Sequence, residues 1–416
     1  MQRKLTHALA CVCAVTLALT VGACGNGAAS HEDGAAAQSS GPIKVALITD
    51  VSGAVALFGE ANVNGAKMAV DELNADGGVL NRKVQLLVKD SKATPETGVQ
   101  LARDAILRDK VAAIFGPVSS GVAVAMTEVA KQYKTPIFFH TSNSQALTTT
   151  NFHKYAFSVV PNSTMEGRGN ALGVKDLGYK RWAVLAPDYE FGHAQSDAFI
   201  QKLKQLDPSA QIVKKLYPPL GETDFNSYIR ATLAAKPDAV YTAMFAGDII
   251  AFTKQARAQG LFDKAFVTGL YDTDALQALK DQAPEGVRAY GRAPFYAIHS
   301  PGISAFNEKY KAKYGKYPSD WAIMAYDAVK VWAQGVEKAG KLDPDALVSA
   351  LEGAQVKTLR GTVEMRAADH QAAVPVYSGT VTQKTKFGFP AWKDVSSTPG
   401  AKVWLTVPEA KAAQKG

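Results

Sequence analysis

Residues 111–139 read VAAIFGPVSSGVAVAMTEVAKQYKTPIFF, and this stretch decides the fold. The apolar run at 111–115 predicts a buried strand, and the apolar spacing over 122–133 is typical of a helix. A second apolar run follows at 136–139. Two strands that are apolar on both faces, joined by a helix, indicate a parallel sheet with helices on both sides.

The same alternation continues in both directions along the chain. Strands are expected at residues 43–48, 84–88, 182–185, 211–216, 239–242, 265–267 and 288–293, and helices at 64–73, 97–108, 165–177, 194–206, 225–235, 249–259, 303–314, 321–338 and 344–351. Because the rhythm restarts after Pro161, we expect an α/β fold with two doubly wound parallel-sheet lobes. Residues 361–404 predict β-hairpins, with the clearest strand at 374–381.

Length and charge limit the class of protein. The 416 residues leave room for two or three domains of the usual size of ~150 residues. Hydrophobic residues make up 47% of the chain, which is enough for a large core. The net charge of +8 is spread thinly, so it indicates a basic surface and no nucleic-acid partner.

The first residues predict export. Arg3 and Lys4 precede the apolar stretch 8–21, whose 14 residues are fewer than the ~20 that span a membrane. This is the pattern of a secretory signal. The small residues before Cys24 resemble the bacterial lipoprotein box, which implies that 1–23 are a signal peptide and that Cys24 carries a lipid. The alternative is an ordinary signal peptide with an incidental cysteine.

The cysteine count is consistent with a lipid anchor. Cys11, Cys13 and Cys24 are the only cysteines, so the folded part is expected to lack disulfides, cysteine zinc sites and cysteine nucleophiles. Residues 24–41 are rich in Gly, Ala and Ser and predict a flexible tether. We therefore expect an exported protein, in the periplasm or at the outer face of the cytoplasmic membrane, that meets the membrane through its lipid anchor alone.

Patterns for catalysis, metals and cofactors are missing from the sequence. Residues 167–173 approach a dinucleotide fingerprint, but they have one residue too many and no strand before them. No serine-hydrolase elbow, His-Glu-x-x-His pattern or Walker loop occurs. Asp272 and Asp274 lack the rest of a calcium loop, and a helix cap is the alternative for Asp272. We expect no enzyme activity, no cofactor and no metal.

Hydroxyl-rich turns follow two strands of the first unit. Ser119 and Ser120 come after the strand at 111–115, and Ser142 and Ser144 come after the next strand. Ligands of open α/β sheets bind at this carboxyl edge, and a helix start offers unpaired N–H groups to a carboxylate. The alternative is that these serines only cap their own helices.

Aromatic residues occupy the corresponding turns of the second unit. They are Tyr189, Phe191, Phe245 and Tyr271, and Phe58 stands in a loop of the first unit. Aromatic walls with a few polar groups at one end are typical of small-molecule sites. Each of these rings taken alone is as consistent with the core as with a pocket.

Several of these residues occur in an order that resembles a known family. In chain order they are Phe58-Gly59, Asn64-Gly65-Ala66, Gly77-Gly78, Asp90, Gly116-Pro117, Ser119-Ser120 and Tyr189-Glu190-Phe191-Gly192, and residues 360–363 and 369–371 add to the likeness. This order resembles the type I periplasmic binding proteins, in particular the leucine/isoleucine/valine-binding branch of ABC importers. The resemblance implies two lobes joined by a multi-strand hinge: 42–162 with 291–375, and 163–290 with 376–416.

The resemblance also implies a function. The protein would be a receptor that closes around a small carboxylate-bearing ligand and delivers it to an ABC permease with its ATPase subunits. The ligand would be a branched-chain or other hydrophobic amino acid, or an aromatic or aliphatic acid. A sensory module of the same fold, or an enzyme that uses the cleft between the lobes, are the alternatives.

Site residues follow from the same resemblance. Ser120 would hold the ligand carboxylate, while Ser142 and Ser144 would contact the head of an amino acid. Phe58, Tyr189, Phe191 and Phe245 would form aromatic walls. The family's ammonium-binding acid falls near Leu270, and Asp272, two residues further on, would take its place as a ligand-binding residue. Without such an acid, an amino acid would bury an unpaired charge.

Overall fold

The computed structural model describes residues 41–53 and 55–415. The signal peptide expected at 1–23, the lipid-bearing Cys24 and all of the expected tether except Gly41 lie outside these residues. In the part of the chain that is described, no helix combines the length and the apolar character needed to cross a membrane.

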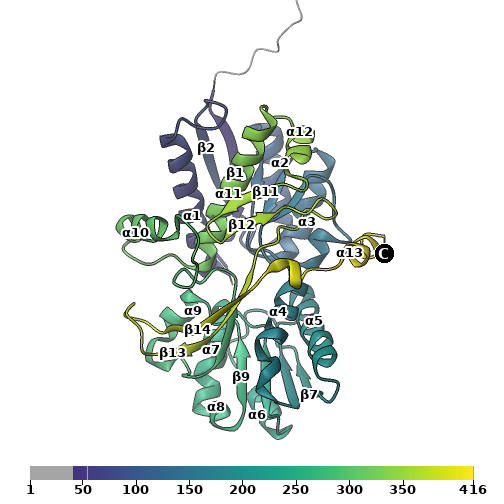
Figure 1. The fold of residues 1–416 in the computed structure, drawn as a ribbon, viewed down its shortest axis with the longest axis vertical. Coiled ribbons are helices and arrows are strands. Elements are labelled where there is room, and N and C mark those ends of the chain that lie inside the picture. Colours follow the sequence, from purple (N-terminus) through teal and green to yellow (C-terminus); the bar gives the residue numbers. More distant parts are fainter. Residues whose placement is uncertain (1–40, 54, 416) are drawn as a thin grey trace, which may run out of the picture. The chain divides into compact units, whose positions relative to one another are not determined.

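The first sheet confirms the parallel arrangement expected from the sequence. Its strands are β1 (Ile43–Thr49), β2 (Val84–Asp90), β3 (Ile114–Phe115), β4 (Ile137–Phe139) and β5 (Ala156–Ser158), in the order β2-β1-β3-β4-β5 (Figure 1). All neighbours pair in parallel. The order reverses between β1 and β3, and ligands of doubly wound sheets bind at such a switch point.

Alternate residues of the first sheet pack on opposite faces. Val45 and Leu47 belong to one hydrophobic cluster, and Ala46 and Ile48 belong to another, together with residues of α2 (Pro95–Asp104) and α3 (Ser120–Gln132). Both faces of the strands are thus buried under helices. This explains why the strands read as continuous apolar runs.

The second sheet repeats the first order and adds two strands. Its strands are β6 (Arg181–Leu185), β7 (Gln211–Leu216), β8 (Ala239–Thr242), β9 (Phe266–Gly269), β10 (Arg288–Gly291), β13 (Val376–Thr382) and β14 (Ala391–Thr398). Five of them run parallel in the order β7-β6-β8-β9-β10, and β13 and β14 continue the sheet as antiparallel strands. Its helices are α4 (Ser163–Val174), α5 (Glu190–Leu206), α6 (Asn226–Ala234), α7 (Ala246–Ala258), α8 (Leu261–Lys264) and α9 (Thr273–Leu279).

A later segment returns to the first sheet. It contains α10 (Ile303–Tyr314), α11 (Asp320–Ala339), α12 (Pro344–Leu351) and the hairpin of β11 (Gln355–Thr358) and β12 (Gly361–Glu364). Helix α11 packs along α1 (Ala56–Ala75), where a Cβ added to Gly65 would lie 2.0 Å from the carbonyl oxygen of Ala322. We call each sheet with its helices a lobe, so the first lobe is completed by a distant part of the chain (Figure 1).

Some sequence expectations are corrected by the structure. The strand expected at 111–115 is reduced to Ile114–Phe115, and β5 was not expected. The hairpins expected at 361–404 are confirmed for β13 with β14, but helix α13 (Val407–Ala413) was missed. Helix α1 starts at Ala56 and not at the expected residue 64, so Phe58 lies in this helix and not in the expected loop. In the second lobe, α5 and α7 start three or more residues before their expected positions, at Glu190 and Ala246. These two starts matter for the site.

The described chain passes between the sheets after β5, after β10 and before β13. The first passage is fixed by side chains from the returning segment. Arg360 donates from Nη2 to the Val159 carbonyl at 2.7 Å, and Gln371 donates from Nε2 to the Val160 carbonyl at 2.8 Å. Arg360 also forms a fully buried ion pair with Asp327 at 2.9 Å. Residues of the 360–371 region therefore support a connection between the lobes.

Candidate functional site

A small cavity lies where the carboxyl edges of the two sheets face each other. It is lined by Phe58, Val118, Ser120, Thr141, Asn143 and Trp321 of the first lobe, by Tyr189, Phe191, Phe245 and Leu270 of the second, and by Arg292, the first residue after β10. Its volume is about 20 Å³, which is room for little more than one water molecule. Admission of a larger molecule requires the walls to separate.

The polar end of the cavity is organised by a buried carboxylate. Asp50, directly after β1, accepts hydrogen bonds at Oδ2 from the N–H groups of Val118 and Ser119, both at 2.9 Å. Its Oδ1 accepts the N–H of Ala93 at 2.9 Å and the hydroxyl of Ser91. These bonds fix the turn between β3 and α3, and with it the direction in which α3 starts.

The start of α3 presents unpaired donors. Ala123 is the first residue whose N–H bonds within the helix, to the Ser119 carbonyl at 3.0 Å, so the N–H groups of Ser120 and Gly121 precede the helical pattern. The side chain of Ser119 makes no cap, so the capping alternative is wrong for this residue. Ser120 is buried and lines the cavity. A helix start of this kind suits a carboxylate.

Ser142 and Ser144 of the second hydroxyl turn lie outside the lining, whereas Thr141 and Asn143 of the same turn belong to it. Ser144 accepts from the N–H of Ala146 at 3.1 Å and caps the short helix Gln145–Thr148, so for Ser144 the capping alternative is correct. Burial raises the pKa of Glu190, and a hydrogen bond from Ser144 acts against this increase. Ser144 therefore contacts the second lobe. Ser142 is joined to the first turn through its N–H, which donates to the Pro117 carbonyl at 3.1 Å.

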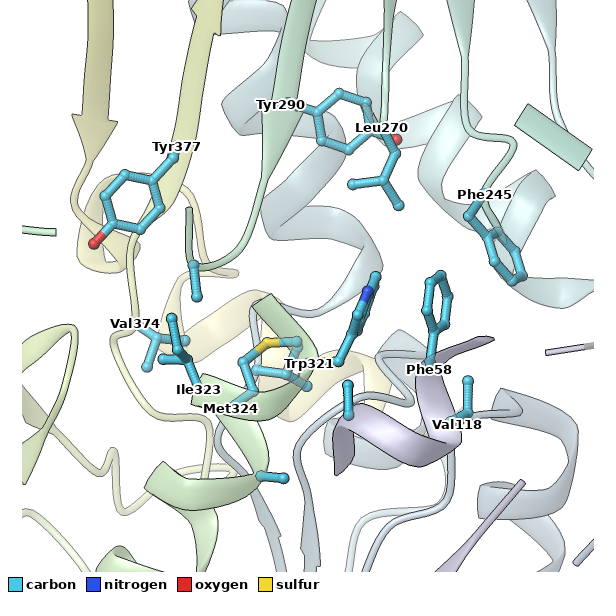
Figure 2. Close-up of a cluster of buried hydrophobic side chains, with 14 of the residues drawn as sticks. Phe58, Val118, Phe245, Leu270, Tyr290, Trp321, Ile323, Met324, Val374 and Tyr377 are labelled. Atoms are coloured by element: carbon cyan, nitrogen blue, oxygen red, sulfur yellow. The ribbon is translucent and has the colours of Figure 1, made fainter. Parts of the chain in front are cut away.

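Aromatic rings from both lobes form the apolar wall. Phe58 stacks on Trp321 with ring centroids 3.9 Å apart, and the Phe245 ring approaches Phe58 to 6.1 Å (Figure 2). Phe191 meets Phe245 edge to face at 5.5 Å, and Tyr189 lies 5.8 Å from Phe191. The structure thus brings together four aromatic residues singled out from the sequence: Phe58, Tyr189, Phe191 and Phe245.

Two of these rings stand at helix starts. Tyr189 is the N-cap residue of α5 and Phe245 is the N-cap residue of α7, and neither side chain caps its helix. Both residues were expected in turns, and each lies directly before the first residue of a helix. Their backbones start the helices while their side chains line the cavity.

Arg292 and Trp321 line the cavity and were missed. Arg292 donates from Nε and Nη2 to Glu166 at 2.6 and 3.1 Å, and from Nη1 to the Thr141 carbonyl at 2.8 Å. Its guanidinium lies 5.0 Å from the centre of the Trp321 ring. Arg292 follows a strand and Trp321 begins a helix. The carboxyl-edge rule that selected the serines would have selected Arg292 too, but not Trp321, because α11 follows helix α10 and no strand.

Tyr271 and Asp272 do not line the cavity, whereas Leu270 does. The Tyr271 hydroxyl lies 3.1 Å from Oγ1 of Thr253, and burial raises its pKa. Asp272 accepts the N–H of Ala275 at 2.8 Å and caps α9. The helix cap, which was the alternative interpretation of Asp272, is therefore correct. Among the residues that the structure describes, no group of three or more His, Cys, Asp or Glu side chains could hold a metal ion.

Comparison with known proteins agrees with this arrangement. The family described as periplasmic binding protein matches residues 42–386. A Leu/Ile/Val-binding protein homolog of Brucella abortus is 27% identical over 86% of this chain and 90% of its own.

Solved structures are similar in fold. A solute-binding protein of an ABC transporter from Rhodopseudomonas palustris, in complex with 3,4-dihydroxybenzoic acid, has a TM-score of 0.78 at 24% identity, covering 86% of this chain and 98% of that one. A leucine-binding protein from Thermotoga maritima has a TM-score of 0.75 at 24% identity, covering 85% and 98%. With two lobes wound in the same order, a cavity between their carboxyl edges and a match over most of its length, this chain belongs to the periplasmic binding protein family.

Proposed function

We propose that this protein is the extracytoplasmic solute receptor of an ABC importer, and that it closes its two lobes around a small carboxylate-bearing ligand. One observation carries the proposal: the unpaired start of α3 and a wall of aromatic rings meet in one cavity between the lobes. A Brucella relative is named for leucine, isoleucine and valine, and a Rhodopseudomonas structure holds a dihydroxybenzoic acid. Hydrophobic amino acids and aromatic or aliphatic acids are the candidate ligands.

Closure follows from the division of the site between the lobes. Ser120 and Asn143 offer polar groups from the first lobe, while Phe191 and Phe245 offer apolar surface from the second. A ligand touches both sets only when the lobes are together, so its binding shifts the population toward the closed form. We propose 42–162 with 291–375, and 163–290 with 376–416, as the bodies that move.

Delivery completes the proposed role. The closed receptor would hand its ligand to the permease, and partner ATPase subunits would supply the energy. A lipid on Cys24 would hold the receptor at the outer face of the membrane. The receptor itself carries out no chemical step in this scheme.

Ligand binding tests the proposal directly. We expect one or more of leucine, isoleucine, benzoate and 4-hydroxybenzoate to raise the melting temperature of the purified protein and to bind in calorimetry. A micromolar Kd corresponds to about −8 kcal/mol. If no carboxylate in a wide panel binds, the proposed function is wrong.

Ser120→Ala tests the polar end of the cavity. Loss of one hydrogen bond to a charged group costs about 1.5–3 kcal/mol, so we expect affinity for the ligand to fall by roughly 10- to 150-fold. Ser349→Ala changes an exposed serine on α12 and is the matched control, with no expected effect on affinity. Equal affinity of the Ser120 variant and the wild type would remove Ser120 from the site.

A further inference from the structure

We propose that the cavity selects carboxylate anions that carry no ammonium group, and that Arg292 is a specificity-determining residue for this class. The inference rests on the proposed function and narrows its ligand to hydrophobic or aromatic monocarboxylates. It is carried by the charges that line the cavity.

Within residues 41–53 and 55–415, the lining holds one cationic side chain, Arg292, and no aspartate or glutamate. Two buried carboxylates next to lining residues are bound by donors of the protein itself. Asp50 accepts four hydrogen bonds from Ser91, Ala93, Val118 and Ser119. Glu166 accepts from Arg292 and, at 2.7 Å, from the side-chain amide of Asn143.

Three helix starts add positive potential at the same place. Helices α3, α5 and α7 begin at Ser120, Glu190 and Ala246, and none has a side-chain cap. Residues at each start line the cavity: Ser120, Tyr189 and Phe245. The N-terminus of a helix carries a partial positive charge, which favours an anion and disfavours a cation.

Arg292 retains donors for a ligand. Its hydrogen bonds to Glu166 and Thr141 use three of the five N–H groups of the guanidinium. The side chain is 3% exposed and packs against the Trp321 ring, so its orientation is fixed before a ligand arrives. In such a buried setting, hydrogen bonds between a guanidinium and a carboxylate are stronger than neutral ones.

Among the described residues, the lining offers an ammonium group no carboxylate as a charged partner. Leu270 is buried at the cavity, and the Trp321 ring already contacts Phe58 and Arg292. Removing an ammonium from water without a partner is costly. Leucine and phenylalanine would incur this cost, whereas the acids with the same carbon skeleton would not.

Asp272 and Asp320 do not supply the missing partner. Neither lines the cavity, and Oδ2 of Asp320 accepts the N–H groups of Arg292 and Ala293 at 2.9 and 2.7 Å. Burial raises the pKa of both carboxyls, and for Asp272 the neighbouring Asp274 adds to this rise. A raised pKa disfavours the charged carboxylate that an ammonium group would need as its partner.

Matched ligand pairs test the inference by calorimetry at pH 7. 4-Methylpentanoate and leucine share a skeleton and differ by the ammonium, as do 3-phenylpropanoate and phenylalanine. We expect at least one acid to bind ten times or more tighter than its amino acid. Equal or tighter binding of both amino acids would overturn the inference and leave the receptor function standing. Failure of every carboxylate to bind would instead overturn the receptor function, and the inference with it.

Two variants test the named residues. Leu270→Asp should reduce the preference for the acid over the amino acid by tenfold or more, and Leu270→Asn is the uncharged control. Arg292→Lys keeps the charge beside Glu166 but loses the planar set of donors, so it should weaken acid binding by tenfold or more. Far-UV circular dichroism and the melting curve establish that each variant is folded. An unchanged preference in a folded Leu270→Asp variant, or unchanged acid affinity in a folded Arg292→Lys variant, would contradict the assignment of that residue.

Discussion

At the scale of single residues, one buried carboxylate determines how the polar end of the site is built. Asp50 fixes the turn that starts α3, and Ser120, the first residue of this helix, lines the cavity. The sequence pointed to Ser120 because it follows a strand and precedes a helix. It gave no sign that Asp50, some 70 residues earlier, holds that turn in place.

A buried histidine makes stability depend on pH. The Thr141 hydroxyl donates to Asn62 at 3.1 Å, so Nδ1 of His140, at 2.9 Å, donates to that hydroxyl and the ring is neutral. Nε2 is buried without a partner, and burial lowers the pKa of His140 to about 3. Burial also lowers the pKa of His153 to about 4. The unfolded chain binds protons near pH 6.5 while the folded protein does not.

Because these pKa values are lowered in the folded protein, stability decreases as the pH falls. Above about pH 6.5, both histidines are neutral in the folded and the unfolded protein, and the free energy of unfolding has its full value. As the pH drops toward 4, it falls by up to about 1.4 kcal/mol per pH unit for each histidine that is protonated only in the unfolded chain. Urea unfolding between pH 4 and 7 measures this slope. His140→Gln should flatten it, and His299→Gln, at an exposed position, should not. An unchanged slope in the His140 variant would show that His140 does not titrate as proposed.

The ring residues show how far single positions could be predicted. Phe58, Tyr189, Phe191 and Phe245 line the cavity, as the sequence analysis expected for aromatic walls. Trp321 was missed because it belongs to a segment that returns to the first lobe after the whole second sheet. The strand and helix pattern alone did not indicate which sheet that segment joins.

At the scale of elements, close packing of two helices fixes the first lobe. Gly65 allows α1 to approach the backbone of α11, since an added Cβ would lie 2.0 Å from the Ala322 oxygen. Gly65→Ala should therefore lower the free energy of unfolding by about 1–3 kcal/mol. Gly247 in α7 has no atom within 4 Å of an added Cβ, so Gly247→Ala should leave stability unchanged or raise it by up to about 1 kcal/mol. Urea unfolding compares the two, and wild-type stability of the Gly65 variant would contradict this packing.

The boundaries of helices were predicted least accurately at the cavity. The interiors of β7, β8, α10 and α12 match the sequence expectation because apolar runs and breakers delimit them. The starts of α5 and α7 do not match, because Tyr189 and Phe245 stand where a capping residue would be expected. At both starts, the aromatic side chain lines the cavity and leaves the helix uncapped.

At the scale of the whole molecule, the proposed motion depends on the passages between the lobes. The first passage is fixed by Arg360 and Gln371, and Arg360 is itself fixed by Asp327. At the cavity, aromatic pairs such as Phe58 with Phe245 join the two lobes, and Asn143 and Arg292 donate to Glu166 of α4. The passage can thus persist while the cavity walls separate, which the volume of about 20 Å³ requires for ligand entry.

The most direct test of closure is the distance between spin labels on the two lobes. Glu96, exposed at the start of α2, and Leu220, 36% exposed after β7, are suitable sites once Cys11, Cys13 and Cys24 are replaced by serine. Pulsed electron paramagnetic resonance would compare Glu96→Cys/Leu220→Cys protein without ligand and with a saturating carboxylate from the calorimetric panel. We expect the ligand to shorten and narrow the distance distribution. Identical distributions with and without a bound ligand would contradict closure of the two lobes around it.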